Sequence, residues 1–215
     1  MSALDPFRSA RLVLELRQSG VTDAAVLTAV EKTPRELFVP YEYRELAYDN
    51  VEVPIDCGQE LTRPVMVGMM VQALKLKPSH RVLEVGAGVG YQATILSKLS
   101  GMVYSIDRFK TLVETARTTI RALEISNIDI RQGDGLHGLK SESPFDRIIL
   151  AGAISAVPDA LLGQLAPMGI LVAPVEVGET QQVRVYTRDE NNVIIHRVLA
   201  PSKFLPLISG EAREL

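Results

Sequence analysis

The stretch "RVLEVGAGVGYQATIL", residues 81–96, decides the fold. An apolar run suited to a buried strand is followed by three glycines spaced by single residues, and then by residues that can form a helix. A glycine turn between a strand and a helix lets a ligand approach the backbone closely, beside the free N–H groups of the helix start. The stretch therefore predicts a small-molecule site after the first strand of a doubly wound sheet.

Short apolar runs and helical stretches alternate after residue 80. The runs predict strands at 81–85, 102–107, 128–132, 145–152 and 169–175, with helices at 90–100, 109–124 and 156–166, the last ended by Pro167. Such alternation is typical of a parallel sheet covered on both faces. The end of the chain differs, because "QQVRVYTRDENNVIIHRVLA" (181–200) reads as two period-2 strands joined by a turn, hence an antiparallel hairpin. We expect an α/β fold with a doubly wound, mostly parallel seven-stranded sheet, an antiparallel C-terminal hairpin and N-terminal helices.

Two helices and a loop-rich segment precede this core. Leu12 and Leu16 lie four residues apart before a stop at Gly20, and Thr22 is expected to cap a second helix that Pro34 ends. Residues 35–63 mix aromatics, prolines and charges without periodicity, which is typical of a loop that forms a binding surface.

A third helix is expected from about residue 64 to 76. We therefore divide the chain into an N-terminal helical and loop segment (1–79) that forms part of the substrate cleft, and a cofactor-binding catalytic core (80–215), together one compact unit.

Composition narrows the function. With 215 residues, 47% of them hydrophobic, the chain can bury one sizeable core. A net charge of -3 without a long Lys/Arg block argues against a nucleic-acid partner. Neither a membrane span nor a signal peptide is indicated, so a cytoplasmic location is expected. The single cysteine, Cys57, cannot form an intrachain disulfide, and three scattered histidines predict no metal site. The oligomeric state is left open.

Two cofactor classes use a glycine turn of this kind. The dinucleotide fingerprint G-x-G-x-x-G requires glycine at position 91, where this chain has Tyr91, so an NAD-linked oxidoreductase is disfavoured. The order from Glu84 to Gly90 is instead E-x-G-x-G-x-G. It resembles the first motif of class I methyltransferases, which use S-adenosylmethionine.

Two further acidic positions fit a nucleoside ligand. Asp107 ends the second strand, 21 residues after Gly86, where a carboxylate accepts hydrogen bonds from a ribose diol. Asp134 and Gly135 follow the third strand, where class I enzymes contact adenine. The expected cofactor-binding residues are Glu84, Gly86, Ala87, Gly88, Asp107, Asp134 and Gly135.

The acceptor is indicated by motifs spread over nearly the whole chain. In order they are "PRELFVPYEYRELAYDN" (34–50), "DCGQELTRP" (56–64), "VLEVGAGVGYQATIL" (82–96), "GDG" (133–135), "FDRIIL" (145–150) and "FLPL" (204–207). Together they resemble the protein-L-isoaspartate O-methyltransferases. Residues 151–154 also lack the D/N-P-P-Y element of many amine methyltransferases, which disfavours base or amide N-methylation.

The resemblance implies a Rossmann-like fold, S-adenosylmethionine as cofactor, and isoaspartyl-containing proteins and peptides as partners, with no nucleic acid or membrane. The methyl acceptor is then the free carboxylate of isoaspartate. A carboxylic acid with a pKa of about 4 is already ionised at neutral pH, so the nucleophile needs no general base. The family's acceptor-site serine, in G-Q-T-I-S-x-P, falls on Thr62, which keeps the hydroxyl donor and is the expected catalytic residue. Gln59 and Arg63 are the expected substrate-binding residues.

Several departures from the family pattern leave other readings open. Glu60 places a carboxylate where the family has threonine, Arg63 is uncommon at its position, and residues 151–157 lack the usual proline and alanine run. Met168 stands where the family has glycine. The alternatives are a class I methyltransferase for another carboxylate acceptor, or a catalytically inactive S-adenosylmethionine-binding relative.

Overall fold

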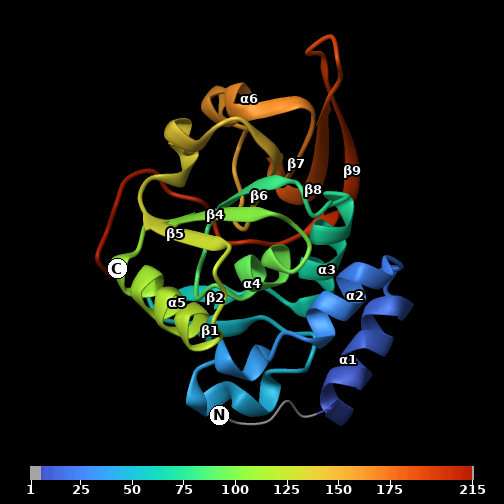
Figure 1. The fold of residues 1–215 in the computed structure, drawn as a ribbon, viewed down its shortest axis with the longest axis vertical. Coiled ribbons are helices and arrows are strands. Elements are labelled where there is room, and N and C mark those ends of the chain that lie inside the picture. The colour runs from blue at the N-terminus through green and yellow to red at the C-terminus, as the bar shows by residue number, and fades with distance from the viewer. Residues whose placement is uncertain (1–5, 215) are drawn as a thin grey trace.

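A seven-stranded β-sheet forms the centre of the molecule (Figure 1). The computed structural model describes residues 6–214. The strands are β3 (Arg81–Val85), β4 (Met102–Asp107), β5 (Ile128–Gln132), β6 (Phe145–Leu150), β7 (Leu165–Val177), β8 (Thr180–Arg188) and β9 (Ile194–Ser202). Their order across the sheet is β5-β4-β3-β6-β7-β8-β9. From β3 the chain adds β4 and β5 on one side of the sheet, and it then returns to add β6 and the later strands on the other side. The position between β3 and β6 is therefore a topological switch point, where α/β proteins bind ligands.

Strand directions match the expected fold class. β3 to β7 run parallel, whereas β8 is antiparallel to both β7 and β9. The expected mostly parallel sheet with an antiparallel C-terminal hairpin is thus confirmed. The hairpin joins the sheet through its first strand, so that the last three strands lie in chain order.

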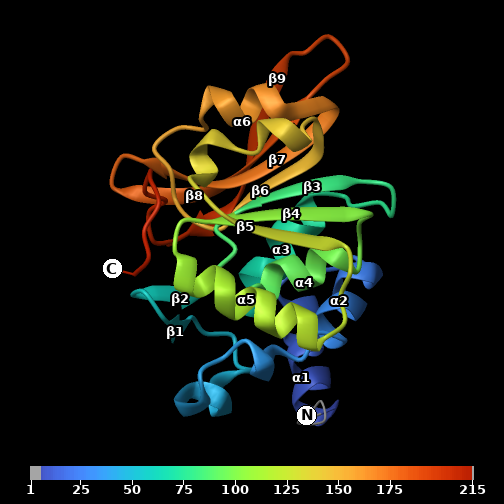
Figure 2. The same cartoon turned by 60° about the vertical axis from the view of Figure 1, so that its left-hand side comes forward.

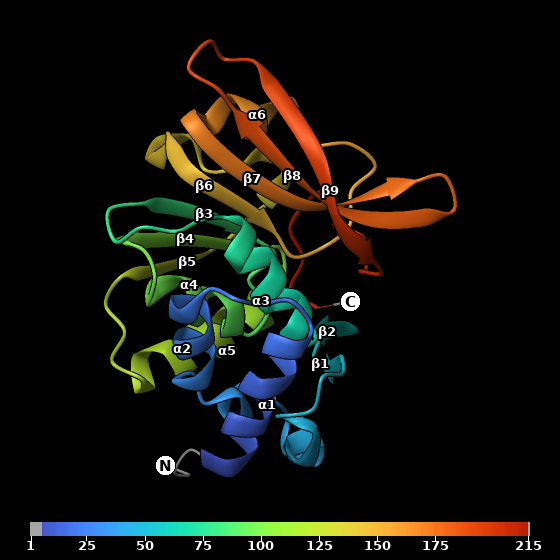
Figure 3. The same ribbon diagram turned by 90° about the vertical axis from the view of Figure 1, so that its right-hand side faces the viewer.

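Helices cover both faces of the sheet. Their bounds are α1 (Pro6–Gln18), α2 (Ala24–Glu31), α3 (Pro64–Ala73), α4 (Tyr91–Ser97), α5 (Lys110–Ala122) and α6 (Asp159–Gln164). Figure 2 shows α3, α4 and α5 on one face and α6 on the other. α1 and α2 form a further layer that packs on α3 (Figure 3). The N-terminal helices expected from the sequence are therefore confirmed.

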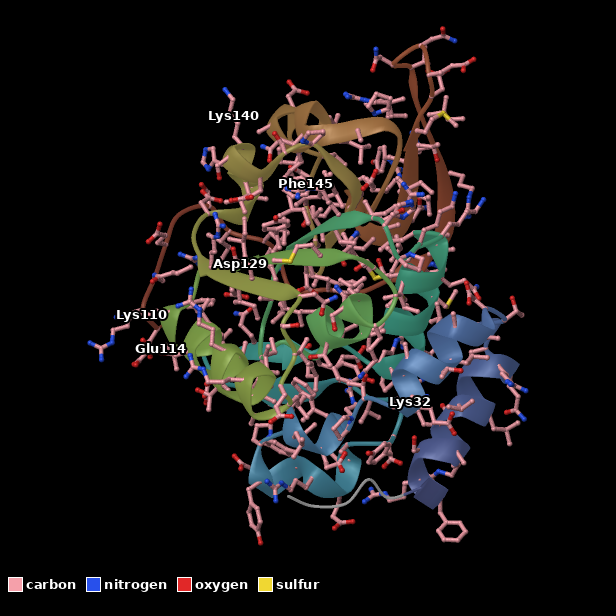
Figure 4. The ribbon with its side chains drawn as sticks, viewed as in Figure 1. Lys32, Lys110, Glu114, Asp129, Lys140 and Phe145 are labelled. Atoms are coloured by element: carbon pink, nitrogen blue, oxygen red, sulfur yellow. The ribbon has the colours of Figure 1, made fainter. Side chains whose placement is uncertain are left out.

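Neighbouring side chains of the central strand β3 point to opposite faces of the sheet and belong to two different buried clusters. Val82 belongs to a cluster that also contains Leu12 and Leu16 of α1, so the N-terminal helices share their core with the sheet. Leu83, the next residue, belongs to a cluster on the opposite face. Phe145 lies within that second cluster, inside the molecule at the start of β6 (Figure 4). Each such fully buried side chain contributes about 2 kcal/mol of hydrophobic stabilisation.

The cap of α2 differs from the expectation. Asp23, not Thr22, is the N-cap, because its carboxylate accepts hydrogen bonds from the backbone nitrogens of Ala25 and Val26 at 2.8 and 3.2 Å. The backbone nitrogen of Thr22 instead donates to Oε1 of Gln72 on α3. The prediction of Thr22 as the cap was wrong because the helix begins at Ala24, which places Asp23 directly before it, and the Thr22 hydroxyl is directed to Gln72 Oε1, 3.5 Å away.

The connection into β7 also differs. α6 is shorter than the expected helix 156–166, and Pro167 does not end it, because β7 already begins at Leu165. Arg188 of β8 donates to the carbonyls of Leu162 and Leu165 at 2.8 and 2.7 Å. β7 thus extends beyond the apolar run from which it was predicted, because Leu165 pairs with Phe145 of β6 and Val177 pairs with Thr180 of β8.

Residues 35–63 are more ordered than the expected loop. They contain two 3-10 helices, η1 (Arg35–Leu37) and η2 (Tyr41–Leu46), and a small antiparallel hairpin of β1 (Val53–Ile55) and β2 (Gln59–Leu61). Two further 3-10 helices, η3 (Gly135–His137) and η4 (Lys140–Glu142), lie between β5 and β6.

The outer surface of α5 is polar. Lys110 and Glu114 extend from it, away from the sheet (Figure 4), with Nζ and Oε1 3.7 Å apart. Within residues 6–214, the structure contains no helix with the length and apolar character needed to cross a membrane.

Candidate active site

A cleft lies at the carboxyl ends of the parallel strands. Its floor and walls come from the turns after β3, β4, β5 and β6, from the N-terminal residues 52–67, and from the C-terminal residues 203–208. It takes in nine of the ten site residues expected from the sequence: Gln59, Thr62, Arg63, Gly86, Ala87, Gly88, Asp107, Asp134 and Gly135. The remaining one, Glu84, does not line the cleft.

The glycine turn has the geometry expected of a ligand-binding loop. Gly86 and Gly88 have φ angles of 92° and 52°, which L residues adopt only at a cost. The backbone nitrogens of Gly86 and Ala87 both donate to the carbonyl of Ile106, at 2.8 and 3.1 Å. These bonds fix the turn against the end of β4. α4 begins directly after it, so its first N–H groups are directed towards the cleft.

Asp107 closes the turn from the β4 side. Its Oδ2 accepts from the backbone nitrogen of Gly88 at 2.8 Å and its Oδ1 from that of Phe109 at 2.9 Å. Asp107 is 8% exposed, and burial raises the pKa of its carboxyl, with the two backbone hydrogen bonds acting in the opposite direction. Each oxygen has a second lone pair, so Asp107 can still accept hydroxyl hydrogens from a ligand in the cleft.

Glu84 stands behind the glycine turn. It is fully buried on β3, where Gln92 of α4 donates to Oε1 at 3.0 Å and the Ser105 hydroxyl of β4 donates to Oε2. Burial raises the pKa of this carboxyl to about 7, although the hydrogen bonds from Ser105 and Gln92 oppose the shift. Through these two hydrogen bonds, Glu84 links the end of β3, just before the glycine turn, to β4 and α4.

Asp134 fastens the C-terminal tail over the cleft. Its Oδ2 accepts from the Ser209 hydroxyl and from the backbone nitrogen of Gly210, the latter at 2.8 Å, and its Oδ1 accepts from Leu136 N. Partial burial raises its pKa, but these hydrogen bonds and the nearby His137 outweigh that effect and lower it. The tail therefore depends on a carboxylate that is ionised at neutral pH.

Position 135 has no room for a side chain, because the residue packs directly against Val85. A β-carbon on this residue would lie 2.4 Å from Cγ1 of Val85, at the end of β3. The glycine thus allows the third turn to lie close to the first.

Thr62 reaches the cleft from the N-terminal side. It lies between β2 and α3, outside any strand or helix, and is half-buried. Within the described residues its hydroxyl has no hydrogen-bond partner, whereas its carbonyl accepts from Nη1 of Arg35 at 3.1 Å. The hydroxyl is thus free to serve a ligand. Nearby, the Gln59 amide donates to the carbonyl of Cys57 at 3.1 Å.

Charges gather at the same end of the cleft. Arg63 Nε lies 3.6 Å from Oε1 of Glu52, and the two side chains are 40% and 42% exposed. Glu60 also lines the cleft and is exposed, but Arg63 pairs with Glu52 and not with it. An exposed pair of this kind holds its partners weakly, so Arg63 remains available to an anionic ligand.

Some cleft residues were not expected from the sequence. The tail residues Lys203–Ile208 form a wall because Leu205 and Leu207 hydrogen-bond to Ala153 after β6, although "FLPL" stood out only as a motif. Glu52, Tyr91 and Gln92 also line the cleft. Tyr91 directly follows the turn in sequence, which is a signal that could have pointed to it.

The comparisons with known proteins agree with this geometry. The family model of the protein-L-isoaspartate(D-aspartate) O-methyltransferases matches residues 7–212. The chain belongs to this family. It is 46% identical to the protein-L-isoaspartate O-methyltransferase of Maricaulis maris (strain MCS10), over 100% of both chains. It is 45% identical to that of Caulobacter sp. (strain K31), over 94% of this chain and 93% of the relative.

Solved structures support the fold. A putative protein-L-isoaspartate O-methyltransferase from Plasmodium falciparum, in complex with S-adenosyl-L-homocysteine, superposes with a TM-score of 0.79 at 25% identity, over 92% of this chain and 97% of that one. A second protein-L-isoaspartate O-methyltransferase has a TM-score of 0.81 at 23% identity, over 92% of this chain and 65% of the other. The family resemblance and the fold class expected from the sequence are both confirmed.

Proposed function

We propose that the chain transfers the methyl group of S-adenosylmethionine to the free carboxylate of L-isoaspartyl residues in damaged proteins, with Thr62 as the residue that binds the acceptor. The assignment of the reaction rests on membership of the isoaspartate O-methyltransferase family. One structural observation supports the assignment of residues: the Thr62 hydroxyl, which has no partner in the described part of the chain, and the glycine turn both line a single cleft.

The cofactor half of the cleft fits a nucleoside with a charged tail. The backbone of Gly86 to Gly88 leaves room for close approach, Asp107 offers acceptor lone pairs for ribose hydroxyls, and Gly135 lies where the adenine is expected. Asp134 supports this half by holding the tail across it. Glu84 braces the turn from behind without reaching the cleft. When bound, the cofactor supplies an electrophilic methyl group on a positively charged sulfur.

The acceptor half needs a hydrogen-bond donor but no base. The isoaspartyl carboxylate is ionised at neutral pH, so one of its oxygens can attack directly while the other accepts from Thr62 Oγ1. One carbon–oxygen bond forms, the sulfur–carbon bond breaks, and its electron pair stays on sulfur. The products are a methyl ester and a neutral thioether, so a negative and a positive charge cancel. Because charge disappears in this step, a partly dehydrated cleft favours it.

The ester then starts the repair outside the enzyme. Methoxide is a better leaving group than the free carboxylate oxygen, so the neighbouring backbone nitrogen attacks the ester carbonyl and expels methanol. The resulting succinimide opens with water, in part to normal aspartate. The chain's own task ends with release of the ester.

The division of labour along the chain is part of the proposal. Residues 1–79, described from residue 6, would form the acceptor wall through Glu52 to Met66, and residues 80–215, described to residue 214, would hold the cofactor. The cytoplasmic location and the absence of nucleic-acid and membrane partners stay predictions.

The reaction is tested with radiolabelled S-adenosylmethionine and two peptides that differ at one residue, isoaspartate or normal aspartate. We expect base-labile label on the isoaspartyl peptide alone. Equal label on both peptides would show that the enzyme methylates carboxylates in general and does not select isoaspartate. No label on either, with S-adenosylhomocysteine binding confirmed by calorimetry, would reject the proposed reaction.

A further inference from the structure

Arg35 is a buried cation at the start of η1. Its side chain has an exposed fraction of 0%. Burying a guanidinium is costly unless other groups replace its water. Within residues 6–214, it meets backbone carbonyls and an aromatic face and has no carboxylate at salt-bridge distance. Among these residues, its Nε finds no hydrogen-bond partner. The protein therefore keeps a positive charge at a position where its burial is costly.

The contacts of Arg35 reach both halves of the cleft. Nη1 donates to the carbonyl of Thr62 at 3.1 Å and Nη2 to that of Val51 at 3.5 Å. The guanidinium carbon lies 4.7 Å from the centre of the Tyr91 ring, a cation–π contact. Tyr91 is the first residue of α4, directly after the glycine turn, and the ring of Phe38 packs on it at 5.6 Å.

Thr62 depends on Arg35 for its orientation. Residues 62 and 63 belong neither to β2 nor to α3, so no strand ladder or helix fixes the Thr62 peptide. Within the described residues, the Thr62 carbonyl accepts a hydrogen bond only from Arg35. Fixing this carbonyl restrains the direction in which Cβ and the hydroxyl point. The same guanidinium lies against the first residue of the cofactor-side helix.

We infer that Arg35 is a positioning residue for methyl transfer, which sets the Thr62 hydroxyl at a fixed place relative to the glycine turn. The inference rests on the proposed role of Thr62. In-line transfer depends steeply on the alignment of donor and acceptor, and a displacement of about 1 Å can reduce the rate about 100-fold. The guanidinium suits this task, because its planar fork can hold two carbonyls while an aromatic ring covers its face.

The test compares Arg35→Met, which removes the donors, with Arg35→Lys, which keeps the charge but not the fork. We expect kcat to fall about 100-fold in Arg35→Met and about 10-fold in Arg35→Lys. The Kd for S-adenosylhomocysteine should change less than about twofold in both. Arg44→Met is the matched control, because Arg44 also lies over a tyrosine ring, that of Tyr41, but on the surface. Its kcat should equal that of the unchanged protein.

A double-mutant cycle separates positioning from general damage. If Arg35 acts through Thr62, Arg35→Met should lower kcat less than about threefold when Thr62→Val is already present. Equal losses in both backgrounds, with Thr62→Val itself slow, would overturn the positioning role alone. Unchanged kcat in Thr62→Val would instead reject the proposed role of Thr62. If Arg35→Met does not bind S-adenosylhomocysteine, the same cycle is carried out with Arg35→Lys.

Discussion

Asp107 Oδ2 accepts a hydrogen bond from the backbone nitrogen of Gly88 at 2.8 Å, so one carboxylate both shapes the glycine turn and faces the cleft. Asp107→Ala removes this bond together with the acceptors for ribose hydroxyls. Hydrogen bonds to a charged group contribute about 1.5–3 kcal/mol each, so we expect the Kd for S-adenosylhomocysteine to rise at least about 10-fold. Isothermal calorimetry measures it.

The matched control for Asp107 is Asp129→Ala. Asp129 lies on the neighbouring strand β5 (Figure 4), pairs with Arg131 at 2.6 Å and does not line the cleft. The Kd of Asp129→Ala for S-adenosylhomocysteine should stay within about twofold of that of the unchanged protein. An unchanged Kd in Asp107→Ala would remove this residue from the cofactor site.

Burial of Glu84 predicts a pH-dependent stability. Its folded-state pKa of about 7 lies above its ordinary value of 4.5, so the folded protein holds this proton more tightly than the unfolded chain. The contribution is fully present below pH 4.5 and is lost as the pH rises through about 7. The difference between the two pKa values of Glu84 corresponds to about 3 kcal/mol in the free energy of unfolding. Glu84→Gln, a neutral replacement of similar shape, should abolish this contribution.

Urea unfolding at about pH 5 and about pH 7.5 measures the effect of Glu84. The difference between the unchanged protein and Glu84→Gln isolates this carboxyl from other groups, such as His80, whose pKa burial lowers. The same pH dependence in both proteins would show that Glu84 is ionised at its ordinary pKa.

The sequence predicted the parallel sheet well because buried parallel strands are continuous apolar runs. The bounds of β3, β4 and β5 agree with the expected ones. Strands of three residues, such as β1 and β2, are too short to show a period of two. The ends of β7 depend on pairing with other strands, Leu165 with Phe145 of β6 and Val177 with Thr180 of β8, which no local pattern contains.

The site was predictable where it is local in sequence. The glycine turn and Asp107 lie within 22 residues of each other, and the distance from Gly86 to the end of the second strand points to Asp107. The anchoring of the tail was not predictable, because Asp134 binds a residue 76 positions away. Nor was Arg35, which meets Thr62 across 27 residues. Such contacts arise only from the packing of the N-terminal segment and the tail against the sheet.

Charge at the acceptor end should tune substrate binding. Arg63→Gln removes a cation that Glu52 holds only weakly, and Glu60→Gln removes an exposed carboxylate from the same wall. We expect the KM for an isoaspartyl peptide to rise about threefold in the first variant and to fall by a similar factor in the second, with kcat nearly constant. Both changes should shrink with added salt, because salt screens exposed charges. Shifts of the same sign in both variants would contradict an electrostatic role.

Met168 adopts a backbone conformation that suits glycine. Its φ angle is 60° and its side chain is 62% exposed, so little packing offsets the strain. Met168→Gly should relieve the strain at some cost in unfolded-chain entropy, which leaves a gain of about 0.5–1 kcal/mol in the free energy of unfolding. The urea midpoint should rise with an unchanged slope. Met168→Ala keeps the strain and should show no gain, so an equal gain in both variants would refute this explanation.

Thr62→Val tests the acceptor site directly, because valine keeps the shape of threonine and lacks its hydroxyl. The lost hydrogen bond to the acceptor carboxylate should lower kcat/KM for the isoaspartyl peptide about 10- to 100-fold. The Kd for S-adenosylhomocysteine should stay constant, since the hydroxyl lies on the N-terminal wall of the cleft. Thr62→Ser is the control, because it retains the donor and should keep most of the activity. If both variants turned over at the same rate, the hydroxyl would have no part in methyl transfer, and the acceptor would have to be held by the neighbouring Arg63 and backbone groups instead.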